Sequence, residues 1–233
     1  MAPSARSGGP VAVIADSHLG GPGGPVEGML GQLAALPAEG VERLVLLGDI
    51  FQAWVGLPRF ETPEIARFVA VLRELRRAGV WIDYIEGNRD FFLAKSPYRD
   101  AFDFVGLETA FEAGGVRYLA VHGDGLNDRD WQYRAWRRLS KSLPVELAMR
   151  TLPRRLARRM VASTDRRLAN TNFKHRAELP EAAIRAFADR RLAEGHDVLL
   201  LGHFHEERTW PVGNGEVRLL EAWFKSRRVE RFG

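Results

Sequence analysis

Histidine, aspartate and asparagine residues follow five separate stretches of this sequence that are rich in Val, Ile and Leu. They are Asp16, His18, Asp49, Asn88, His122, His203 and His205. The set uses four of the chain's six histidines, and its oxygen and nitrogen donors suit divalent first-row metals. Seven donors are too many for one metal that keeps open positions, but they suit two metals that share a bridging ligand. Two such ions about 3.5 to 4 Å apart form a clamp for displacement at a phosphoester.

The apolar stretches before these residues are predicted to be β-strands. We place strands at 11–15, 43–47, 80–85, 116–121 and 198–201, and a further pair at 217–220 and 228–232. Their alternation with helical patterns is typical of βα units around a buried sheet. Because ligands of open α/β sheets bind beyond the carboxyl ends of the strands, the polar clusters are expected to converge on one place. The segment His203-Phe204-His205 must then be a bent loop, so that both imidazoles can face one site.

Helical patterns occupy most of the remaining sequence. One runs over 62–77 and a second over 180–194. Residues 130–170 have helical periodicity interrupted at Pro144 and Pro153, so they are predicted to form two or three short helices rather than a βα unit. We therefore expect one α/β domain over residues 1–233, with a helical insertion, or lid, at 130–170.

Composition excludes several classes of protein. The 233 residues are 45% hydrophobic and 27% charged, which is typical of a globular chain with a sizeable core. The chain has no cysteine, which excludes disulfides, thiolate zinc sites, iron–sulfur clusters and a cysteine nucleophile. No apolar run approaches 18 residues, and the first ten residues lack the apolar stretch of a secretory signal. We expect a cytoplasmic protein.

Positive charge is concentrated in one segment. The formal net charge is +4, yet residues 134–167 contain 11 basic and two acidic side chains, a net of +9, which leaves the other 199 residues at −5. Basic side chains interleaved with leucine, valine and methionine suit a protein that lies on an anionic membrane surface. Charge alone fits a solvated helical lid or a nucleic-acid-binding face equally well.

Five motifs in a fixed order resemble those of the calcineurin-like metallophosphoesterases. They are D-x-H, G-D, G-N-R-D, H-G-D and G-H-x-H, from Asp16 to His205. Within that family the chain is most similar to the UDP-2,3-diacylglucosamine pyrophosphatase branch of lipid A synthesis, which has arginine in G-N-R-D. The similarity extends over 46–56, 86–93 and 122–137, and to Glu221-Ala222-Trp223. The resemblance implies an αββα fold, a β-sandwich core flanked by helices, with a small helical insertion.

The resemblance also implies a dinuclear metal site. Two divalent ions are expected, usually Mn²⁺, with Fe, Zn and Mg as alternatives. One ion would be held by Asp16, His18, Asp49 and His205, and the other by Asp49, Asn88, His122 and His203, so that Asp49 bridges. The metals would activate water for attack on phosphorus.

Further side chains receive expected roles from the same resemblance. Arg89 would stabilise the negative charge that develops at phosphorus, and Asp90, also expected in the catalytic set, would hold Arg89 or a ligand histidine. Substrate contacts would come from Asn88, Arg89 and His203, and from Asp130 and Tyr133 at the sugar and nucleotide end.

The implied reaction is hydrolysis of the pyrophosphate bond of UDP-2,3-diacylglucosamine to UMP and 2,3-diacylglucosamine 1-phosphate. The expected partners are this lipid-linked nucleotide sugar and, through residues 134–167, the inner face of the cell membrane, where the protein would be peripheral. A nucleic-acid partner is not expected, and the sequence leaves the oligomeric state open. The same metals would serve a soluble phosphodiesterase, nucleotide pyrophosphatase or nuclease. An inactive scaffold on this fold is a third alternative, although such a protein would be expected to have lost ligands.

Overall fold

The computed structural model describes residues 8–126, 131–157, 159–164 and 179–233. Within these residues the strands form two five-stranded sheets and a two-stranded ribbon. The first sheet has the order β12 (Glu230–Phe232), β1 (Val11–Ile14), β2 (Arg43–Leu46), β4 (Trp81–Ile85) and β6 (Phe104–Gly106). The second has the order β10 (Arg208–Val212), β11 (Gly215–Leu219), β9 (Val198–Leu201), β8 (Val116–Val121) and β7 (Glu108–Ala113). The ribbon pairs β3 (Trp54–Val55) with β5 (Asp90–Phe91).

The central strands of both sheets are parallel. In the first sheet β1, β2, β4 and β6 run in one direction and only β12 is antiparallel. In the second sheet β8, β9 and β11 are parallel, with antiparallel β7 and β10 at the two edges. Within each sheet, the carboxyl ends of these central strands therefore lie together.

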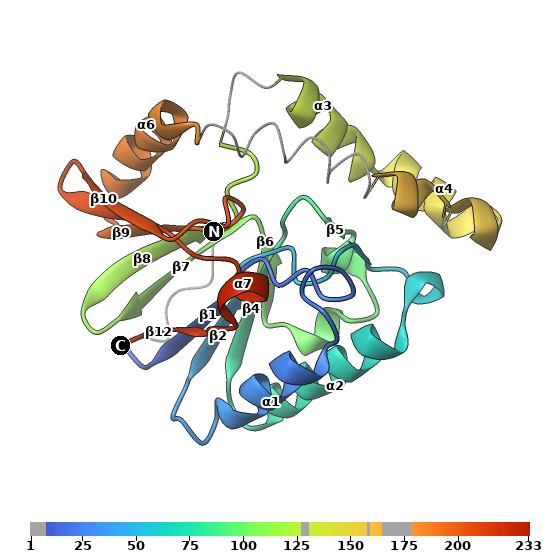
Figure 1. Cartoon of the computed structure of the whole chain (residues 1–233), viewed down its shortest axis with the longest axis horizontal. Coiled ribbons are helices and arrows are strands. Elements are labelled where there is room, and N and C mark those ends of the chain that lie inside the picture. Colours follow the sequence, from blue (N-terminus) through green and yellow to red (C-terminus); the bar gives the residue numbers. More distant parts are fainter. Residues whose placement is uncertain (1–7, 127–130, 158, 165–178) are drawn as a thin grey trace.

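Three apolar layers hold the sandwich together. Between the sheets lies a cluster that includes Val13 and Val45 from one sheet and Ala120 and Leu200 from the other. The outer face of the first sheet is covered by α1 (Glu27–Ala35) and α2 (Pro63–Arg77), and that of the second by α6 (Glu181–Leu192) (Figure 1). All four residues of β1, β2 and β9 are buried, as expected for strands covered on both faces. The expected αββα sandwich is confirmed.

The α2 helix has clear signals at both ends. Thr62 is its N-cap, and the Thr62 hydroxyl accepts a hydrogen bond from the Ile65 N–H at 3.3 Å. Pro63 occupies the first turn, where a missing N–H costs nothing. Past the C-terminus, Gly79 adopts a φ of +94°, which favours glycine. The helix predicted at 62–77 is confirmed, and α6 lies within the predicted 180–194.

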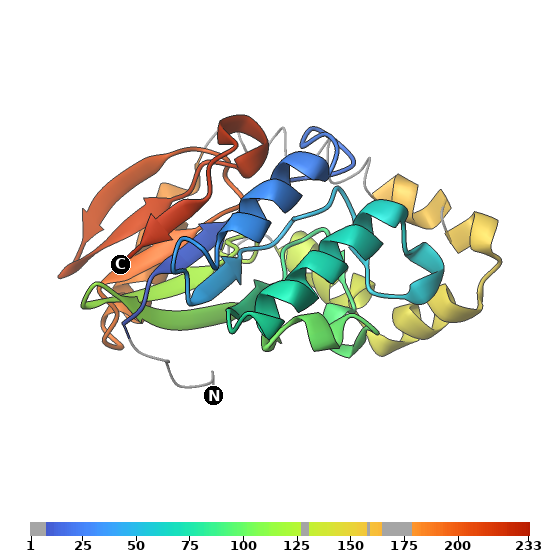
Figure 2. The same cartoon turned by 90° about the horizontal axis from the view of Figure 1, so that it is seen from below.

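Short helices from the insertion lie outside the sandwich (Figures 1 and 2). They are α3 (Trp131–Ser140) and α4 (Leu143–Thr151), followed by helical residues at 154–157 and 159–164. Pro144 lies in the first turn of α4, and Pro153 follows its C-cap, so both prolines mark helix boundaries as predicted. Met149 and Ala157 pack against Val55 and Phe91 of the β3–β5 ribbon. This contact seats the insertion beside the loops that carry the predicted ligands.

Short elements complete the described chain. They are the 3₁₀ turns η1 (Pro58–Phe60), η2 (Leu93–Lys95) and η3 (Arg99–Ala101), and the helix α7 (Trp223–Ser226).

Candidate metal centre

The loops that follow β1, β2, β4, β8 and β9 bring all seven predicted ligands into one buried region, which we call the metal centre. All of its side chains are buried except that of His203, which is half-buried. Charged and polar groups are rarely buried unless paired or bound to metal. The predicted convergence of the five polar clusters is confirmed.

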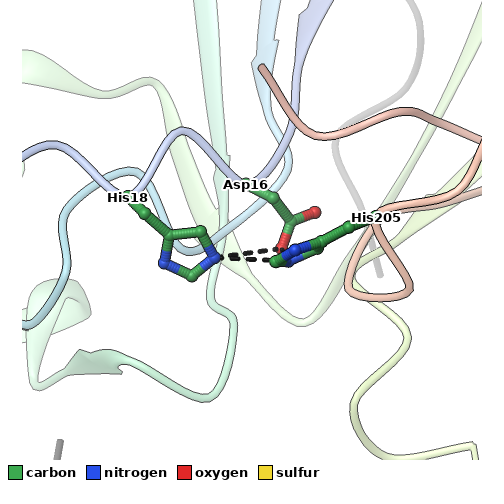
Figure 3. A group of neighbouring side chains, drawn as sticks. All are labelled: Asp16, His18 and His205. Atoms are coloured by element: carbon green, nitrogen blue, oxygen red, sulfur yellow. Dashed lines mark hydrogen bonds and ion pairs between the residues drawn. The ribbon is translucent and has the colours of Figure 1, made fainter. Parts of the chain in front are cut away.

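One part of the centre, the His18 group, consists of Asp16, His18 and His205 (Figure 3). The His205 Nε2 atom lies 3.0 Å from Asp16 Oδ1 and 3.3 Å from His18 Nε2. The second oxygen of Asp16 accepts a hydrogen bond from the His203 backbone N–H at 2.7 Å. Three donor atoms therefore face one point, and the first and last of the five loops are joined there.

The other part, the His122 group, consists of Asp49, Asn88 and His122. The His122 Nε2 atom lies 3.7 Å from Asp49 Oδ2 and 3.4 Å from Asn88 Oδ1. The opposite ring nitrogen, Nδ1, is 2.8 Å from the Leu47 carbonyl oxygen. In the neutral ring, Nδ1 carries the proton and donates it to that carbonyl oxygen, so Nε2 is the atom that can bind a metal. The ring of His203 is 5.3 Å from that of His122.

One carboxylate, that of Asp16, lies close to members of both groups. Donor atoms of Asp16, Asp49 and His122 lie within 4.8 Å of one another, as do those of Asp16, His18 and His205. Asp16 thus belongs to both sets, whereas the resemblance gives Asp49 the bridging position. Both carboxylates lie where the groups meet.

The backbone of the centre is strained. In the described part of the chain seven non-glycine residues have positive φ, and five of them are Asp16, His18, Asp49, His203 and His205. Such conformations cost of order 1–3 kcal/mol each and concentrate at functional sites. The positive φ at both His203 and His205 confirms the predicted bent loop.

Close packing explains why glycine flanks the ligands. A Cβ atom on Gly87 would lie 2.3 Å from Asp49 Oδ1 and 2.7 Å from His122 Nε2. A Cβ on Gly202 would lie 2.6 Å from Asp16 Oδ2. Any larger residue at these positions would displace a ligand.

The electrostatics of the centre favour bound cations. Burial, with the nearby charges of Asp90 and Asp16, raises the pKa of Asp49 to about 7. Burial would lower the pKa of His122, but the carboxylates of Asp49 and Asp16 outweigh it and raise that pKa to about 9. Burial, together with the charge of His122, lowers the pKa of His203 to about 3. The carboxylates therefore attract positive charge, which without a metal is the proton of His122, whereas His203 is neutral, the form in which histidine binds metals. A metal at His122 Nε2 would take the place of that proton.

Buried nitrogen atoms of the centre also lack partners. Within the described residues no hydrogen bond is formed by His18 Nδ1, Asn88 Nδ2, His203 Nδ1 or His205 Nδ1. Buried polar atoms without partners are rare in folded proteins. The atoms that face one another are Asp16 Oδ1 and the Nε2 atoms of His18 and His205, and this mixed carboxylate and imidazole donor set fits divalent cations.

Comparison with known proteins identifies the family. No protein-family model matches the chain. It is 31% identical to a UDP-2,3-diacylglucosamine hydrolase of Ralstonia nicotianae, over 94% of this chain and 85% of the relative. The chain belongs to the UDP-2,3-diacylglucosamine hydrolase family. Relatives of the same name from Marinobacter nauticus and Pseudomonas fluorescens are 29% and 32% identical, over 84% and 68% of this chain and 79% and 67% of theirs. A solved archaeal phosphodiesterase, 12% identical, covers 96% of this chain and 98% of its own with a TM-score of 0.47.

Membership of the hydrolase family confirms the resemblance inferred from the five motifs and the expected enzyme class. None of the helices in the described ranges is both long and apolar enough to cross a bilayer.

Arg89 and Asp90, the residues expected to be catalytic in this hydrolase family member, have different surroundings. Arg89 is buried with its Nε atom 3.7 Å from Asp49 Oδ2, and its Nη1 atom donates to the Gln52 carbonyl oxygen at 3.0 Å. Arg89 also lines an apolar pocket under the insertion. Asp90 accepts hydrogen bonds from the backbone N–H groups of Asp49 and Gly87 at 3.0 and 2.8 Å. Its other oxygen accepts from the Tyr84 hydroxyl, so Asp90 braces two ligand loops.

The two remaining predicted substrate contacts lie in the insertion. Asp130 falls outside the described residues. The Tyr133 hydroxyl donates to Asp124 Oδ2 at 2.5 Å, and Arg137 Nε donates to the same oxygen at 2.6 Å. Burial would raise the pKa of Asp124, but the charge of Arg137 holds it well below its usual range.

Sequence reasoning missed three residues that contact the centre from outside. Lys141 Nζ donates to the Gly87 carbonyl oxygen at 2.8 Å, and Lys225 Nζ donates to the His205 carbonyl oxygen at 2.6 Å. The ring of Phe224 packs against those of His18 and His205. The four-residue spacing of Tyr133, Arg137 and Lys141 was the available signal for Lys141.

Proposed function

We propose that this chain hydrolyses the pyrophosphate bond of UDP-2,3-diacylglucosamine, releasing UMP and 2,3-diacylglucosamine 1-phosphate. The observation that carries the proposal is the buried metal centre in a chain whose relatives bear that enzyme name over most of its length. The alternative of a soluble metallophosphoesterase with another substrate needs the same centre, so the substrate test below separates the two.

The metal centre would hold two divalent ions. Asp16, His18, Asp49 and His205 would bind one, and Asp49, Asn88, His122 and His203 the other, with Mn²⁺ as the expected metal. Bound there, the ions supply Lewis acidity at the phosphoryl oxygens and lower the pKa of an attacking water.

The chain's own residues orient the pyrophosphate. The Arg89 guanidinium lies between Asp49 and the pocket, where it can stabilise negative charge that develops on a phosphoryl oxygen. Because Arg89 is buried, this interaction is little screened by water. Asp90 accepts hydrogen bonds from the backbone N–H groups of Asp49 and Gly87, which keeps Asp49 and Arg89 in position relative to each other.

An apolar pocket begins at Arg89 and offers a place for acyl chains. Its apolar lining comes from the ribbon side and from the insertion: Val55, Phe91, Phe92, Val145, Met149, Met160 and Val161. A lipid-linked nucleotide sugar has a pyrophosphate group and hydrocarbon chains. Arg89 suits the first and the apolar pocket suits the second. We assign the insertion, expected at 130–170, the role of a lid over the acyl chains.

The outer surface of the insertion suits a membrane. Among the described residues, six of the seven large exposed apolar side chains lie here: Trp131, Leu139, Leu143, Leu147, Leu156 and Met160. Exposed arginines stand among them at positions 134, 138, 150, 154, 155 and 159. Apolar side chains that insert at the headgroup boundary and cations that attract anionic lipid fit a peripheral protein. We place it on the cytoplasmic face of the cell membrane.

The decisive experiment compares two substrates. Mn²⁺-loaded protein is incubated with UDP-2,3-diacylglucosamine in mixed micelles and, separately, with a chromogenic phosphodiester, and UMP and chromophore release are measured. We expect rapid UMP release and much slower diester hydrolysis, with both abolished in Asp49→Ala. Turnover of the diester without UMP release would overturn the proposed substrate and leave a metallophosphoesterase of other specificity.

A further inference from the structure

One face of α3 contacts the metal centre from outside. Tyr133 and Arg137 of α3, and Lys141 directly after its last residue, stand four residues apart and therefore lie on the same side of the helix. Tyr133 and Arg137 both donate to Asp124 Oδ2, and Lys141 Nζ donates to the Gly87 carbonyl oxygen and lies 3.5 Å from Glu86 Oε2. Two separate ligand loops are thus tied to one helix of the insertion.

These contacts are sheltered from water. The side chains of Asp124 and Arg137 are 4% and 19% exposed, and those of Lys141 and Glu86 are each 13% exposed. Removing one partner of a buried charge pair costs far more than breaking an exposed pair. The position of α3 and that of the two loops therefore depend on each other.

The loops that α3 holds belong to the same part of the centre. Gly87 immediately precedes Asn88, and Asp124 stands two residues after His122, so both loops carry members of the His122 group. The hydrogen bonds that Arg137 and Lys141 donate to Asp124 and Gly87 therefore lie on the His122 side of the centre.

The His18 group is supported by another helix. Lys225 of α7 donates to the His205 carbonyl oxygen, and the Phe224 ring lies 5.6 Å from the ring of His18 and 5.1 Å from that of His205. Lys141 and Lys225 make the same kind of contact, an ammonium group on the backbone carbonyl of a ligand loop, but at opposite parts of the centre.

We propose that α3 is a positioning element for the His122 group, so that docking of the lid and filling of the metal position at Asn88 and His122 are one linked equilibrium. The metal position at His18 and His205 would be linked to the lid only indirectly, through the bridging Asp49. The inference rests on the metal-binding role proposed above. Linkage is reciprocal: a metal at the His122 group tightens docking of α3, and loss of the α3 contacts weakens binding of that metal.

The test measures metal and backbone exchange in the full chain without substrate. Wild type, Lys141→Met, Lys225→Met and the exposed control Lys95→Met are loaded with Mn²⁺ and titrated with a chelator, and metal per chain is counted. Lys141→Met is expected to release one of two Mn²⁺ ions at a chelator strength about 10- to 100-fold lower than wild type, as loss of supporting contacts to metal ligands typically does. Lys141→Arg, which keeps a donor for Gly87, is expected to recover most of that affinity.

Hydrogen exchange of the α3 backbone identifies which position is affected. Mn²⁺ is expected to slow exchange in α3 of wild type, Lys95→Met and Lys225→Met, and to leave it unchanged in Lys141→Met. If Lys141→Met retained both ions with wild-type affinity, the inference would be overturned. The same would follow if Mn²⁺ did not change the rate of hydrogen exchange in α3 of the wild type. Because the metal and hydrogen-exchange measurements use no substrate, their interpretation does not depend on whether the protein releases UMP in the substrate experiment. A wild type that binds fewer than two Mn²⁺ ions would overturn both proposals.

Discussion

The Nε2 atoms of His18 and His205 lie 3.3 Å apart although the two residues are 187 positions apart in the sequence. Asp16 Oδ1 completes the triangle at 3.0 Å from His205 and 3.9 Å from His18. Such a set of donors exists only in the folded chain, so an ion bound there acts on stability as well as on chemistry.

Metal removal is therefore expected to lower the melting temperature. At a Mn²⁺ concentration 100-fold above the dissociation constant, one site stabilises the folded state by about 2.7 kcal/mol, which corresponds to roughly 5–10 °C for a chain of this size. Calorimetry with and without chelator measures the difference. In a His18→Ala/His205→Ala variant the shift should shrink to that of the other site, and an equal shift in both proteins would contradict the assignment of these histidines.

Arg89→Met should damage catalysis and spare metal binding. The guanidinium is assigned to charge that develops at phosphorus, and loss of one such donor typically lowers kcat by about 10²- to 10³-fold. Steady-state UMP release gives kcat, and metal analysis gives the Mn²⁺ content. The surface variant Arg77→Met serves as the matched control, and a kcat for Arg89→Met near that of the control would remove Arg89 from the mechanism.

Membrane binding should depend on the exposed leucines of α4. Leu143→Ser/Leu147→Ser is expected to weaken sedimentation with vesicles containing phosphatidylglycerol by about tenfold or more, since each buried apolar side chain contributes on the order of 1–2 kcal/mol. Added salt should weaken binding of wild type as well. Leu107→Ser is the control because Leu107 is 54% exposed and lies outside the insertion. Equal losses in the two variants would refute docking through α4.

Arg43→Met should destabilise the fold without reaching the metal centre. Arg43 donates to Asp83 Oδ2 and to the Thr109 hydroxyl, and the Trp81 indole donates to the other Asp83 oxygen. Without Arg43 the buried Asp83 carboxylate loses its cation, which typically costs about 3–5 kcal/mol. Urea unfolding at pH 7 measures this loss, and Arg43→Met/Asp83→Leu should recover part of it. A double variant no more stable than Arg43→Met would exclude an uncompensated charge as the cause.

The Arg73–Asp100 ion pair predicts how the free energy of unfolding changes at acidic pH. Two hydrogen bonds from Arg73 at 2.8 Å lower the pKa of the Asp100 carboxyl. A lowered folded-state pKa means that the stabilisation is complete above the unfolded value of about 3.9 and is lost as pH falls through the folded value. Since the pair is exposed, Asp100→Asn should cost only about 0.5 kcal/mol at neutral pH. The difference in the free energy of unfolding between wild type and Asp100→Asn should shrink as pH falls below about 3.9, and a difference that stays constant with pH would rule out this linkage.

The sequence predicted the buried strands best and the edge strands worst. Runs such as VAVI and VLLL are buried on both faces and stand out as continuous apolar stretches. The β7 strand, ETAFEA, alternates between buried and half-buried residues, and β10, RTWPV, contains Pro211. Proline is tolerated there because β10 lies at the edge of its sheet. Neither strand carries the continuous apolar signal on which the prediction relied, and the same holds for β6.

Helix α1 was also missed, because Gly28 and Gly31 interrupt its pattern. Burial of Met29 and Leu33 against the first sheet outweighs the cost of these two glycines. The strand predicted at 228–232 is shorter, beginning at Glu230, since Arg227 adopts a positive φ after α7.

The convergence of the seven candidate ligands was predictable because they follow strands whose ends must meet. Side chains that brace the metal centre come from elements with no such constraint: Lys225 lies on a four-residue helix, and Lys141 follows α3 in the insertion. Their contacts are with backbone carbonyl groups, which residue types do not reveal. The four-residue spacing from Tyr133 and Arg137 indicates a shared face for Lys141, but only the structure shows which carbonyl groups the two lysines contact.

Asp16 and His205 bind each other across 189 positions of sequence. During synthesis a ribosome delivers the first ligand loop long before the last. The His18 group can therefore form only after residue 205 has left the exit tunnel, and a chain truncated before that point lacks one of the three donor side chains of this group.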